Sequence, residues 1–213
     1  MLCAVIPVNE LRRAKSRLGG VLSPAQRERL VLAMLEDVLA ALRGSGALPV
    51  LVSPEDLRGR VEGEFEMLVE GRRRGLREAV RLGNEHACTL GAEATLFLPA
   101  DVPLIRRRHV REMLRMGRRY PVVVAPSMKG GISALYRCPP AVIPEVFSDR
   151  TFLEVRRCTS ERGVELGVYD SFYLALDIDT PEDVREFMYH GAGTRTYEVL
   201  EEMVRDYEIV ARR

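Results

Sequence analysis

The sequence predicts a layered α/β fold, because short apolar runs of the kind found in buried strands alternate with longer segments of helical periodicity. The chain has 213 residues, which is enough to bury a substantial core, and no repeat, low-complexity segment or linker divides it. We therefore expect one domain over residues 1–213, in which residues 191–213 form a helical extension at the carboxyl end.

The amino-terminal part of the chain predicts three strands and two helices. Residues 5–8, 49–52 and 66–69 are apolar runs of strand length. Ser23–Gln26 reads as a capping box with proline at the first helical position, and apolar residues then recur at helical spacing as far as Leu42. The following Arg-Gly pair supplies a cationic last turn and a glycine cap, and a second helix is expected after Gly75.

The rest of the chain continues this alternation. The segments expected, in order, are a strand leading to Asp101, a helix around 110–114, a strand at 122–125, a glycine turn and an alternating strand at 130–136, a helix within 147–162, strands at 164–169 and 174–177, and helices from Pro181 and from Thr194. The last helix carries an apolar stripe of Tyr197, Leu200, Met203 and Val204. Ordinary core packing is the first interpretation of this stripe, and a dimer contact is the alternative.

The overall composition excludes several classes of protein. A formal net charge of +1 argues against a general nucleic-acid binder. Positive charge clusters instead at 12–17, 72–74 and 106–108, which suits a nucleotide or a small acidic substrate. No apolar stretch is long enough to span a bilayer, and no signal peptide is recognised. The four cysteines lack metal-binding spacing, so we expect reduced, mostly buried thiols in a cytoplasmic protein.

The apolar run that ends at Asp101 is the first candidate for a functional site. A carboxylate follows directly on a predicted buried strand, with Pro103 two residues later. Ligands of open α/β sheets bind beyond the carboxyl ends of the strands, so Asp101 is placed where a metal-bound phosphate could be held. The alternative is that Asp101 only initiates a turn before the proline.

A basic loop after the first strand is the second candidate. Residues 9–20 contain four cations, among them Lys15 and Arg17, together with Ser16 and a glycine pair. Such a loop can wrap a polyphosphate with its cations and its backbone N–H groups, although it lacks the spacing of a Walker A loop. The alternative is a solvated, exposed surface loop.

The third candidate is the pair Asp177 and Asp179. On a strand these carboxylates would share one face, and paired carboxylates near a third aspartate suit Mg²⁺. A helix start with Thr180 as N-cap explains part of this segment, but it does not explain Asp177. We expect Asp101 and Asp179 to converge on one Mg²⁺ ion. Asp101→Asn should then abolish turnover, and relief of like-charge repulsion could stabilise the metal-free protein.

Taken together, these motifs resemble the 2-phospho-L-lactate guanylyltransferase family of coenzyme F420 biosynthesis, which includes enzymes that prefer phosphoenolpyruvate. The similarity lies in 6–27, with its Ala-Lys-Ser-Arg-Leu core, in 98–104, which is similar to the family's L-x-x-D-L-P-L, and in 130–135, which is similar to G-G-T-N-A-L. Residues 169–172 and 177–183 match in order and spacing. The resemblance covers nearly the full chain.

The resemblance implies a three-layer, Rossmann-like nucleotidyltransferase domain of the nucleotide-diphospho-sugar transferase type, with a mostly parallel mixed sheet. It also implies transfer of GMP from GTP to 2-phospho-L-lactate or phosphoenolpyruvate, release of pyrophosphate, Mg²⁺ as cofactor, and a homodimer. Catalytic roles would fall to Lys15, Arg17 and Asp101. The implied nucleotide contacts are Pro7, Val8, Lys15, Ser16, Arg17, Ser53 and Leu76. The implied acceptor contacts are Gly130, Gly131, Ser133 and Thr151, and the implied metal ligands are Asp101, Asp177 and Asp179.

The chain departs from the family pattern at three places. It has Leu76-Arg77 where the family has L-N, Ile132-Ser133 where the family has T-N, and 147–155 where a glycine-serine turn followed by histidine is expected. Ser133, Arg150 and Thr151 are the candidate replacements as donors. These departures favour two alternatives: a nucleotidyltransferase for another phosphorylated acceptor or another nucleotide, and a paralogue that binds nucleotide without turnover. A plain α/β binding module is disfavoured, because it needs no carboxylates at its strand ends.

Overall fold

The computed structural model describes residues 1–71, 75–148 and 150–211, with residues 205–211 described by their backbone alone. The predicted cationic cluster at 72–74 therefore lies outside the described residues. The strands are β1 Leu2–Pro7, β2 Ala47–Ser53, β3 Glu66–Val69, β4 Ala94–Phe97, β5 Val122–Pro126, β6 Ile132–Arg137 and β7 Leu166–Val168. The helices are α1 Pro24–Leu42, α2 Leu76–Thr89, α3 Arg107–Gly117, α4 Thr151–Glu161, α5 Phe172–Ala175, α6 Pro181–His190 and α7 Arg195–Ala211, with 3₁₀ turns η1 Leu11–Arg13 and η2 Ser16–Leu18.

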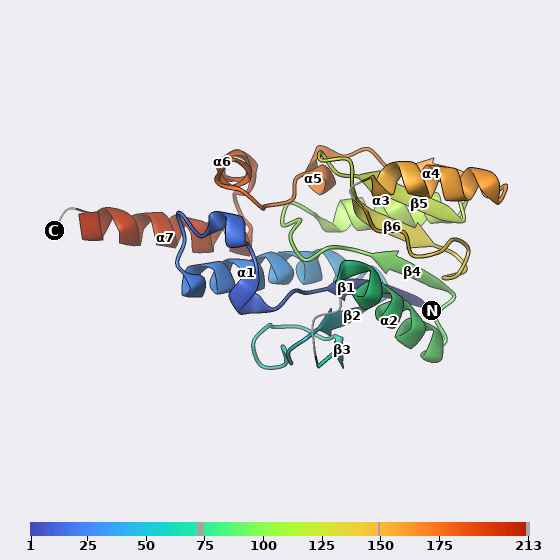
Figure 1. Cartoon of the computed structure of the whole chain (residues 1–213), viewed down its shortest axis with the longest axis horizontal. Coiled ribbons are helices and arrows are strands. Elements are labelled where there is room, and N and C mark those ends of the chain that lie inside the picture. The colour runs from blue at the N-terminus through green and yellow to red at the C-terminus, as the bar shows by residue number, and fades with distance from the viewer. Residues whose placement is uncertain (72–74, 149, 212–213) are drawn as a thin grey trace.

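The strands form one mixed sheet in the order β3-β2-β1-β4-β6-β5-β7 (Figure 1). Strand β6 runs antiparallel to both of its neighbours, β4 and β5. The other pairings, β1 with β2 and β4, β2 with β3, and β5 with β7, are parallel. The prediction of a mostly parallel mixed sheet is confirmed.

Helices cover both faces of the sheet and make three layers. Alternate residues of β1 belong to different core clusters: Ala4 and Ile6 pack with side chains of α1 and α3, whereas Cys3 and Val5 pack with α2. On the α2 side, α4 covers the other half of the sheet through Val155. Burial on both faces explains why these strands read as continuous apolar runs. It also explains why β6, expected to alternate, is buried almost throughout.

The approach of α2 to the sheet depends on a glycine. A β-carbon at Gly83 would lie 3.0 Å from Cγ2 of Val52 and closer still to Val5. Real β-carbons are not found so close to neighbouring carbons, so any larger residue would push α2 away from β1 and β2. The amino end of α2 borders the cavity described below, and Gly83 therefore helps to set the position of that end.

The predicted helix starts are confirmed. Ser23 caps α1 and exchanges hydrogen bonds with Gln26. Thr180 caps α6 in the same way with Asp183, and proline occupies the first turn of both helices. Gly44 follows the end of α1 with a φ of 71°, as expected for a glycine that terminates a helix.

Helix α7 is part of the core. Two residues of its predicted apolar stripe, Leu200 and Met203, are buried, as is the neighbouring Val199, whereas Tyr197 is half-buried and Val204 is exposed. The helix packs along α1 (Figure 1). Asp37 of α1 accepts hydrogen bonds from the backbone N–H groups of Arg195 and Thr196, both at 2.9 Å, and so satisfies the first turn of α7. Core packing, the first interpretation of this stripe, is therefore confirmed for Leu200 and Met203.

One predicted strand is wrong. Residues 174–177 do not join the sheet, because the chain forms the short helix α5 and then crosses the carboxyl edge of the sheet without strand pairing. The backbone N–H of Ile178 donates to the carbonyl of Asp101 at 3.1 Å, and the Ile178 side chain is fully buried. Apolar residues in this segment are buried at the end of the sheet rather than within it, and periodicity alone does not separate these two situations.

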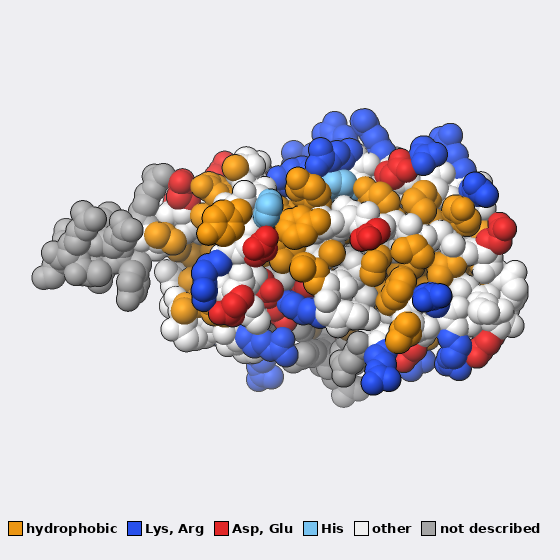
Figure 2. All heavy atoms as spheres, turned by 90° about the horizontal axis from the view of Figure 1, so that it is seen from above, with side chains coloured by type: hydrophobic (Ala, Val, Ile, Leu, Met, Phe, Trp, Pro, Cys, Tyr) orange, Lys and Arg blue, Asp and Glu red, His pale blue; other side chains and the backbone are white. Residues whose placement is uncertain are grey.

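The surface carries clustered positive charge (Figure 2), and two of the four cysteines are buried. Figure 2 shows Lys and Arg side chains gathered along one edge of the viewed face and hydrophobic side chains across its middle. The cysteines are free, with Cys3 and Cys158 buried, Cys88 exposed and Cys138 between the two. Across the part of the chain that the structure describes, none of the helices combines the length and the apolar character needed to cross a membrane.

Candidate active site

A cavity of about 290 Å³ lies beyond the carboxyl ends of β1, β2 and β4. This is the edge where open α/β sheets bind their ligands. The cavity is lined by Pro7, Val8, Asn9, Ala14, Lys15, Val31, Met34, Pro54, Glu70, Gly75, Leu76, Ala79, Pro99, Ala100, Asp101 and Asp179. Six residues singled out from the sequence are thus brought together: Pro7, Val8, Lys15, Leu76, Asp101 and Asp179.

Lys15 joins two of the predicted carboxylates. Its Nζ donates to Oδ2 of Asp101 at 2.6 Å and to Oδ1 of Asp179 at 3.0 Å. The Lys15 side chain is only 8% exposed, so the expectation of a wholly exposed basic loop is wrong at this residue. Arg17 does lie at the surface, 69% exposed, and its NH1 reaches Oδ2 of Asp179 at 3.2 Å.

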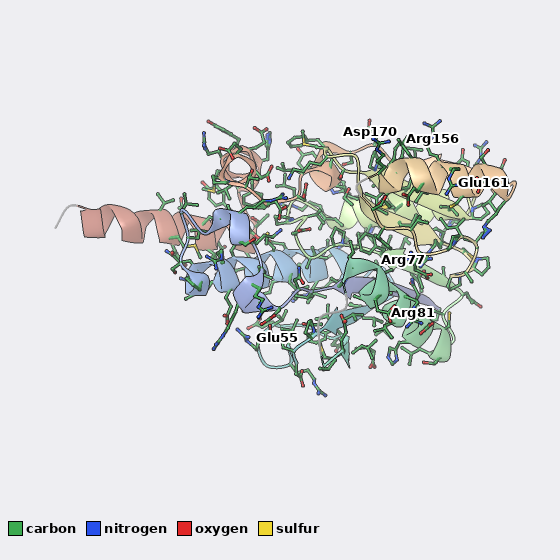
Figure 3. The ribbon with its side chains drawn as sticks, in the orientation of Figure 1. Glu55, Arg77, Arg81, Arg156, Glu161 and Asp170 are labelled. Carbon is green, nitrogen blue, oxygen red and sulfur yellow. The ribbon has the colours of Figure 1, made fainter. Side chains whose placement is uncertain are left out.

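The backbone of the basic loop is shaped around Lys15. Among the described residues other than glycine, Lys15 alone has a positive φ, 54°, a left-handed conformation that costs a residue with a β-carbon about 1–2 kcal/mol. The loop is held by the buried side chains of Leu11 and Leu18. It is also held by Glu55, which accepts a hydrogen bond from the Leu11 N–H at 2.7 Å (Figure 3). Strain of this kind gathers at functional sites, where the surroundings enforce it.

The electrostatics at Lys15 favour its charged form. Burial by itself would lower the pKa of Lys15, but the negative charges of Asp101 and Asp179 and their hydrogen bonds outweigh it and raise the pKa above 10.5. Lys15 is therefore an ammonium ion at neutral pH. A buried charge of this kind is retained because it is paired on two sides.

The predicted convergence of Asp101 and Asp179 is confirmed as a geometric statement. Both carboxylates contact the same Nζ atom, so their oxygens lie within the sum of two hydrogen-bond distances. Asp101 stands in the turn after β4, fixed by the buried side chains of Val102 and Leu104. Asp179 reaches the same place from the segment before α6, which the Ile178–Asp101 backbone hydrogen bond ties to that turn.

Asp177 does not share a face with Asp179, which corrects the prediction from strand spacing. Its carboxylate lies 3.3 Å from Nζ of Lys129, on the hairpin between β5 and β6, and the same ammonium contacts Asp183 at 2.9 Å. Burial, followed by the negative charge of Asp101, raises the pKa of Asp177, and Lys129 opposes this shift. Lys129 and Glu55 were not assigned from sequence, because their partners are distant along the chain and no local pattern indicates them. Asp183 has a local signal as the capping partner of Thr180, but its contact with Lys129 has none.

Two of the predicted aspartates are suited to a metal ion. Asp101 and Asp179 fit, because their oxygens already share one positive charge and Mg²⁺ is usually held by one or two carboxylates together with substrate phosphates. A third ligand is not in place. Within residues 1–71, 75–148 and 150–211, no group of three or more His, Cys, Asp or Glu side chains is arranged to hold a metal ion. Asp177, paired with Lys129, remains a predicted outer partner.

The amino end of α2 borders the cavity on another side. Gly75, Leu76 and Ala79 line it, and Gly75 has a φ of 89°, which suits glycine. The first N–H groups of a helix attract negative or polar ligand atoms. Arg77 is exposed on the first turn and is not among the lining residues (Figure 3). The Arg77 side chain is therefore not part of the cavity wall.

Several predicted contacts lie away from the cavity wall. Ser53 is fully buried, and its hydroxyl accepts from the N–H of Glu55. Ser16 is exposed on η2. The hydroxyl of Ser133 is buried against carbonyls of β5, and that of Thr151 is bonded to the backbone of Ser148.

The hydroxyls of Ser133 and Thr151 are therefore committed within the fold, and their predicted role as acceptor donors has no support in the geometry. The turn at Gly130 and Gly131 is different. It lies on the hairpin that carries Lys129, beside the Asp177 segment, and Gly130 has a φ of 83°.

Comparison with known proteins identifies the family. Residues 2–210 match the family described as guanylyl transferase CofC like. The chain belongs to this family. It is therefore a guanylyltransferase, a nucleotidyltransferase enzyme, and the family resemblance drawn from its motifs is confirmed.

Two relatives of this CofC-like chain carry different substrate names. It is 37% identical over 203 residues to the 2-phospho-L-lactate guanylyltransferase of Methanothermobacter thermautotrophicus, covering 94% of this chain and 90% of the relative. It is 40% identical over 204 residues to the phosphoenolpyruvate guanylyltransferase of Rubrobacter xylanophilus, covering 88% and 94%.

A solved structure shows the same fold. The CofC-like chain superposes with a TM-score of 0.78, at 18% identity and with 97% of each chain covered, on a Desulfovibrio desulfuricans G20 protein assigned to the nucleotide-diphospho-sugar transferases. The predicted fold class is confirmed.

Proposed function

We propose that this protein transfers GMP from GTP to a phosphorylated three-carbon acid, 2-phospho-L-lactate or phosphoenolpyruvate, in coenzyme F420 biosynthesis. Membership of the guanylyl transferase family and the names of the two relatives support this proposal. The observation that carries it is the junction of Lys15, Asp101 and Asp179 on the wall of a cavity at the carboxyl edge of the sheet. That junction brings a buried cation and two carboxylates together, which are groups that can neutralise phosphate charge and hold a metal ion.

In the proposed reaction, an oxygen of the acceptor's phosphate attacks the α-phosphorus of GTP. The bond from the α-phosphorus to the oxygen that bridges to the β-phosphate breaks, and pyrophosphate leaves with that oxygen and its electron pair. Such a transfer needs mainly positioning and neutralisation of negative charge. Lys15, on the cavity wall, and Arg17, beside it at the surface, would supply positive charge to the phosphates, and the first turn of α2 lies along the same cavity.

Mg²⁺ belongs to this proposal as the cofactor. Asp101 and Asp179 would hold it together with phosphate oxygens of the nucleotide, and it would supply neutralisation of the charge that develops during transfer. Asp177 would not bind the metal ion directly but would lie outside its ligands, where it contacts Lys129. The acceptor is assigned to the N–H groups at Gly130 and Gly131, because their hairpin adjoins the aspartate segment through the same lysine.

Release of pyrophosphate tests the proposal directly. The purified protein is incubated with Mg²⁺, with GTP or ATP, and with 2-phospho-L-lactate, phosphoenolpyruvate or 3-phosphoglycerate. We expect release with GTP and one of the first two acceptors, and loss of release in Asp101→Asn. A paralogue without turnover would give no release with any pair. Equal release with ATP would remove guanine from the assignment, and release with 3-phosphoglycerate alone would redefine the acceptor.

We also expect a homodimer, and the cysteine pattern leads us to expect a cytoplasmic location. Both remain predictions. Light scattering during size-exclusion chromatography tests the homodimer, because one chain has a mass of 24.0 kDa and a dimer has twice that mass. Cell fractionation tests the second.

A further inference from the structure

Lys15 contacts both carboxylates that are proposed to hold the metal ion. Its ammonium donates to Oδ2 of Asp101 and to Oδ1 of Asp179, and its side chain is almost fully buried between them. The ammonium therefore neutralises, on the wall of the cavity, the two carboxylates that are proposed to bind a divalent cation.

We propose that Lys15 is a displaceable internal cation: it holds Asp101 and Asp179 together in the free protein, and a divalent cation binding to the pair displaces it toward the nucleotide phosphates. This inference rests on the proposed function for the identity of the metal site, and it goes beyond it by assigning Lys15 two alternative partners. Two positive groups cannot share the same carboxylate oxygens without repelling each other. Metal binding and the position of Lys15 are therefore linked.

The neighbouring cations show that this role is specific to Lys15. Arg17 reaches only Oδ2 of Asp179, and most of its side chain is in solvent. Lys129 bridges two further aspartates close to Asp179 in the sequence, Asp177 and Asp183. Each bridging lysine thus contacts its own aspartate pair, and among these three cations Lys15 is the one that contacts both Asp101 and Asp179.

The conformation of the loop is consistent with a bistable element. Lys15 adopts its left-handed backbone between the 3₁₀ turns η1 and η2, and its ammonium is the only side-chain group of the described loop, 9–20, that touches Asp101. The side chain also lies on the wall of the cavity, so the ammonium can leave the carboxylates by side-chain rotation without leaving the site. The same charge would then be offered to a phosphate instead of to Asp101.

The consequence is a penalty on metal binding in the absence of nucleotide. In the wild type a divalent cation that takes Oδ2 of Asp101 and Oδ1 of Asp179 must break the two charge-assisted hydrogen bonds of Lys15. A cation that takes the other oxygens of the pair still meets the positive charge of Lys15 at close range. The nucleotide offers Lys15 new anionic partners and so reduces this penalty, which makes metal and nucleotide binding mutually favourable. Removal of the lysine charge should therefore strengthen binding of the metal alone, which is the opposite of the effect expected from loss of a metal-site residue.

The test measures Mn²⁺ binding without nucleotide. The concentration of free Mn²⁺ is followed by electron paramagnetic resonance in titrations of the full-length wild type, Lys15→Met, Arg17→Met and Asp101→Asn. We expect Lys15→Met to bind Mn²⁺ about ten-fold more tightly than the wild type, within the range typical of coupled sites. Arg17→Met is the matched control, because it removes the same charge from the same loop next to Asp179, and it should change affinity by less than about three-fold. Asp101→Asn should abolish the binding.

A second measurement keeps the test decisive if Lys15→Met is less stable. The rise in melting temperature on adding Mn²⁺ should be larger for Lys15→Met than for the wild type, because the ligand stabilises in proportion to its affinity. Equal or weaker Mn²⁺ binding by Lys15→Met overturns the proposal. An equal gain in Mn²⁺ affinity in Arg17→Met also overturns it, because removal of any positive charge from the loop would then be the cause. Mn²⁺ binding that survives in Asp101→Asn overturns it as well. None of these outcomes depends on turnover, so the transfer reaction is tested separately.

Discussion

Replacement of Asp101 by asparagine tests the charge arrangement of the site in the absence of metal. From the sequence alone, two aspartates at one place predict repulsion, so this change could stabilise the metal-free protein. The structure reverses that prediction, because Lys15 donates to Asp101 at 2.6 Å and neutralises the pair. Loss of the carboxylate charge should therefore weaken a favourable interaction rather than relieve an unfavourable one.

The expected loss of stability in Asp101→Asn follows from how exposed the Lys15 and Asp101 side chains are. A hydrogen bond to a charged group contributes about 1.5–3 kcal/mol, and fully exposed ion pairs contribute about 0–1 kcal/mol. The Lys15 side chain is 8% exposed and that of Asp101 is 30% exposed, so the pair lies between these limits. Asparagine still offers Lys15 an amide oxygen. We therefore expect a loss of about 1–2 kcal/mol in the free energy of unfolding, or roughly 2–8 °C in melting temperature for a chain of this size.

The assay is calorimetric unfolding at pH 7 in the presence of a chelator. Asp170→Asn (Figure 3) is the matched control, because it removes the same charge from an exposed residue that does not line the cavity, and it should change stability by less than about 0.5 kcal/mol. Leu104→Ala, at a fully buried position, sets the scale of a core truncation at about 2–5 kcal/mol. An Asp101→Asn protein as stable as the wild type, or more stable, would refute the role given to Lys15.

Three further predictions concern the loop, the packing of α2 and the amino end of α3. Arg17→Ala should weaken GTP binding in calorimetric titration by roughly ten-fold with an unchanged melting temperature, since its side chain is 69% exposed; full affinity would show that it is only a solvated residue. Gly83→Ala should lower the free energy of unfolding, measured with denaturant, by about 1–3 kcal/mol, because the new β-carbon would collide with side chains of β1 and β2. Gly20→Ala is the control and should leave stability unchanged, because a β-carbon there has no atom within 4 Å. Similar losses for the two variants would contradict the close approach of α2. Burial, followed by the charges of Arg108 and Arg106, lowers the pKa of His109 from 6.5 to about 4. The neutral ring therefore stabilises the fold fully above pH 6.5, and this stabilisation is lost as the pH falls from 6.5 toward 4. His109→Gln should flatten the stability profile in that window, and a profile as steep as the wild type's would count against a buried neutral ring.

Some parts of the site could be predicted from sequence because they depend on neighbours along the chain. The end of β4 and the position of Asp101 follow from an apolar run and a turn. The starts of α1 and α6 follow from Ser23 and Thr180, whose side chains act three residues ahead. Failures occurred where a local pattern has two solutions. Residues 174–177 have the length and polarity of a strand. In the structure they instead end helix α5 and begin the segment that crosses the end of the sheet, where their apolar side chains are buried without strand pairing.

What the sequence determined by itself is the alternation of elements, the chemistry of the basic loop and the aspartates, and the family to which these motifs belong. Tertiary structure alone decided which charges meet. Lys15 finds Asp101 across 86 residues and Asp179 across 164, while Asp177, two residues away, faces Lys129 instead. Periodicity and turn chemistry act over a few residues, whereas the choice of partner for a buried charge depends on strand order and on the direction in which each crossover returns the chain. The burial of Lys15 between two carboxylates therefore has no signature in the loop that contains it.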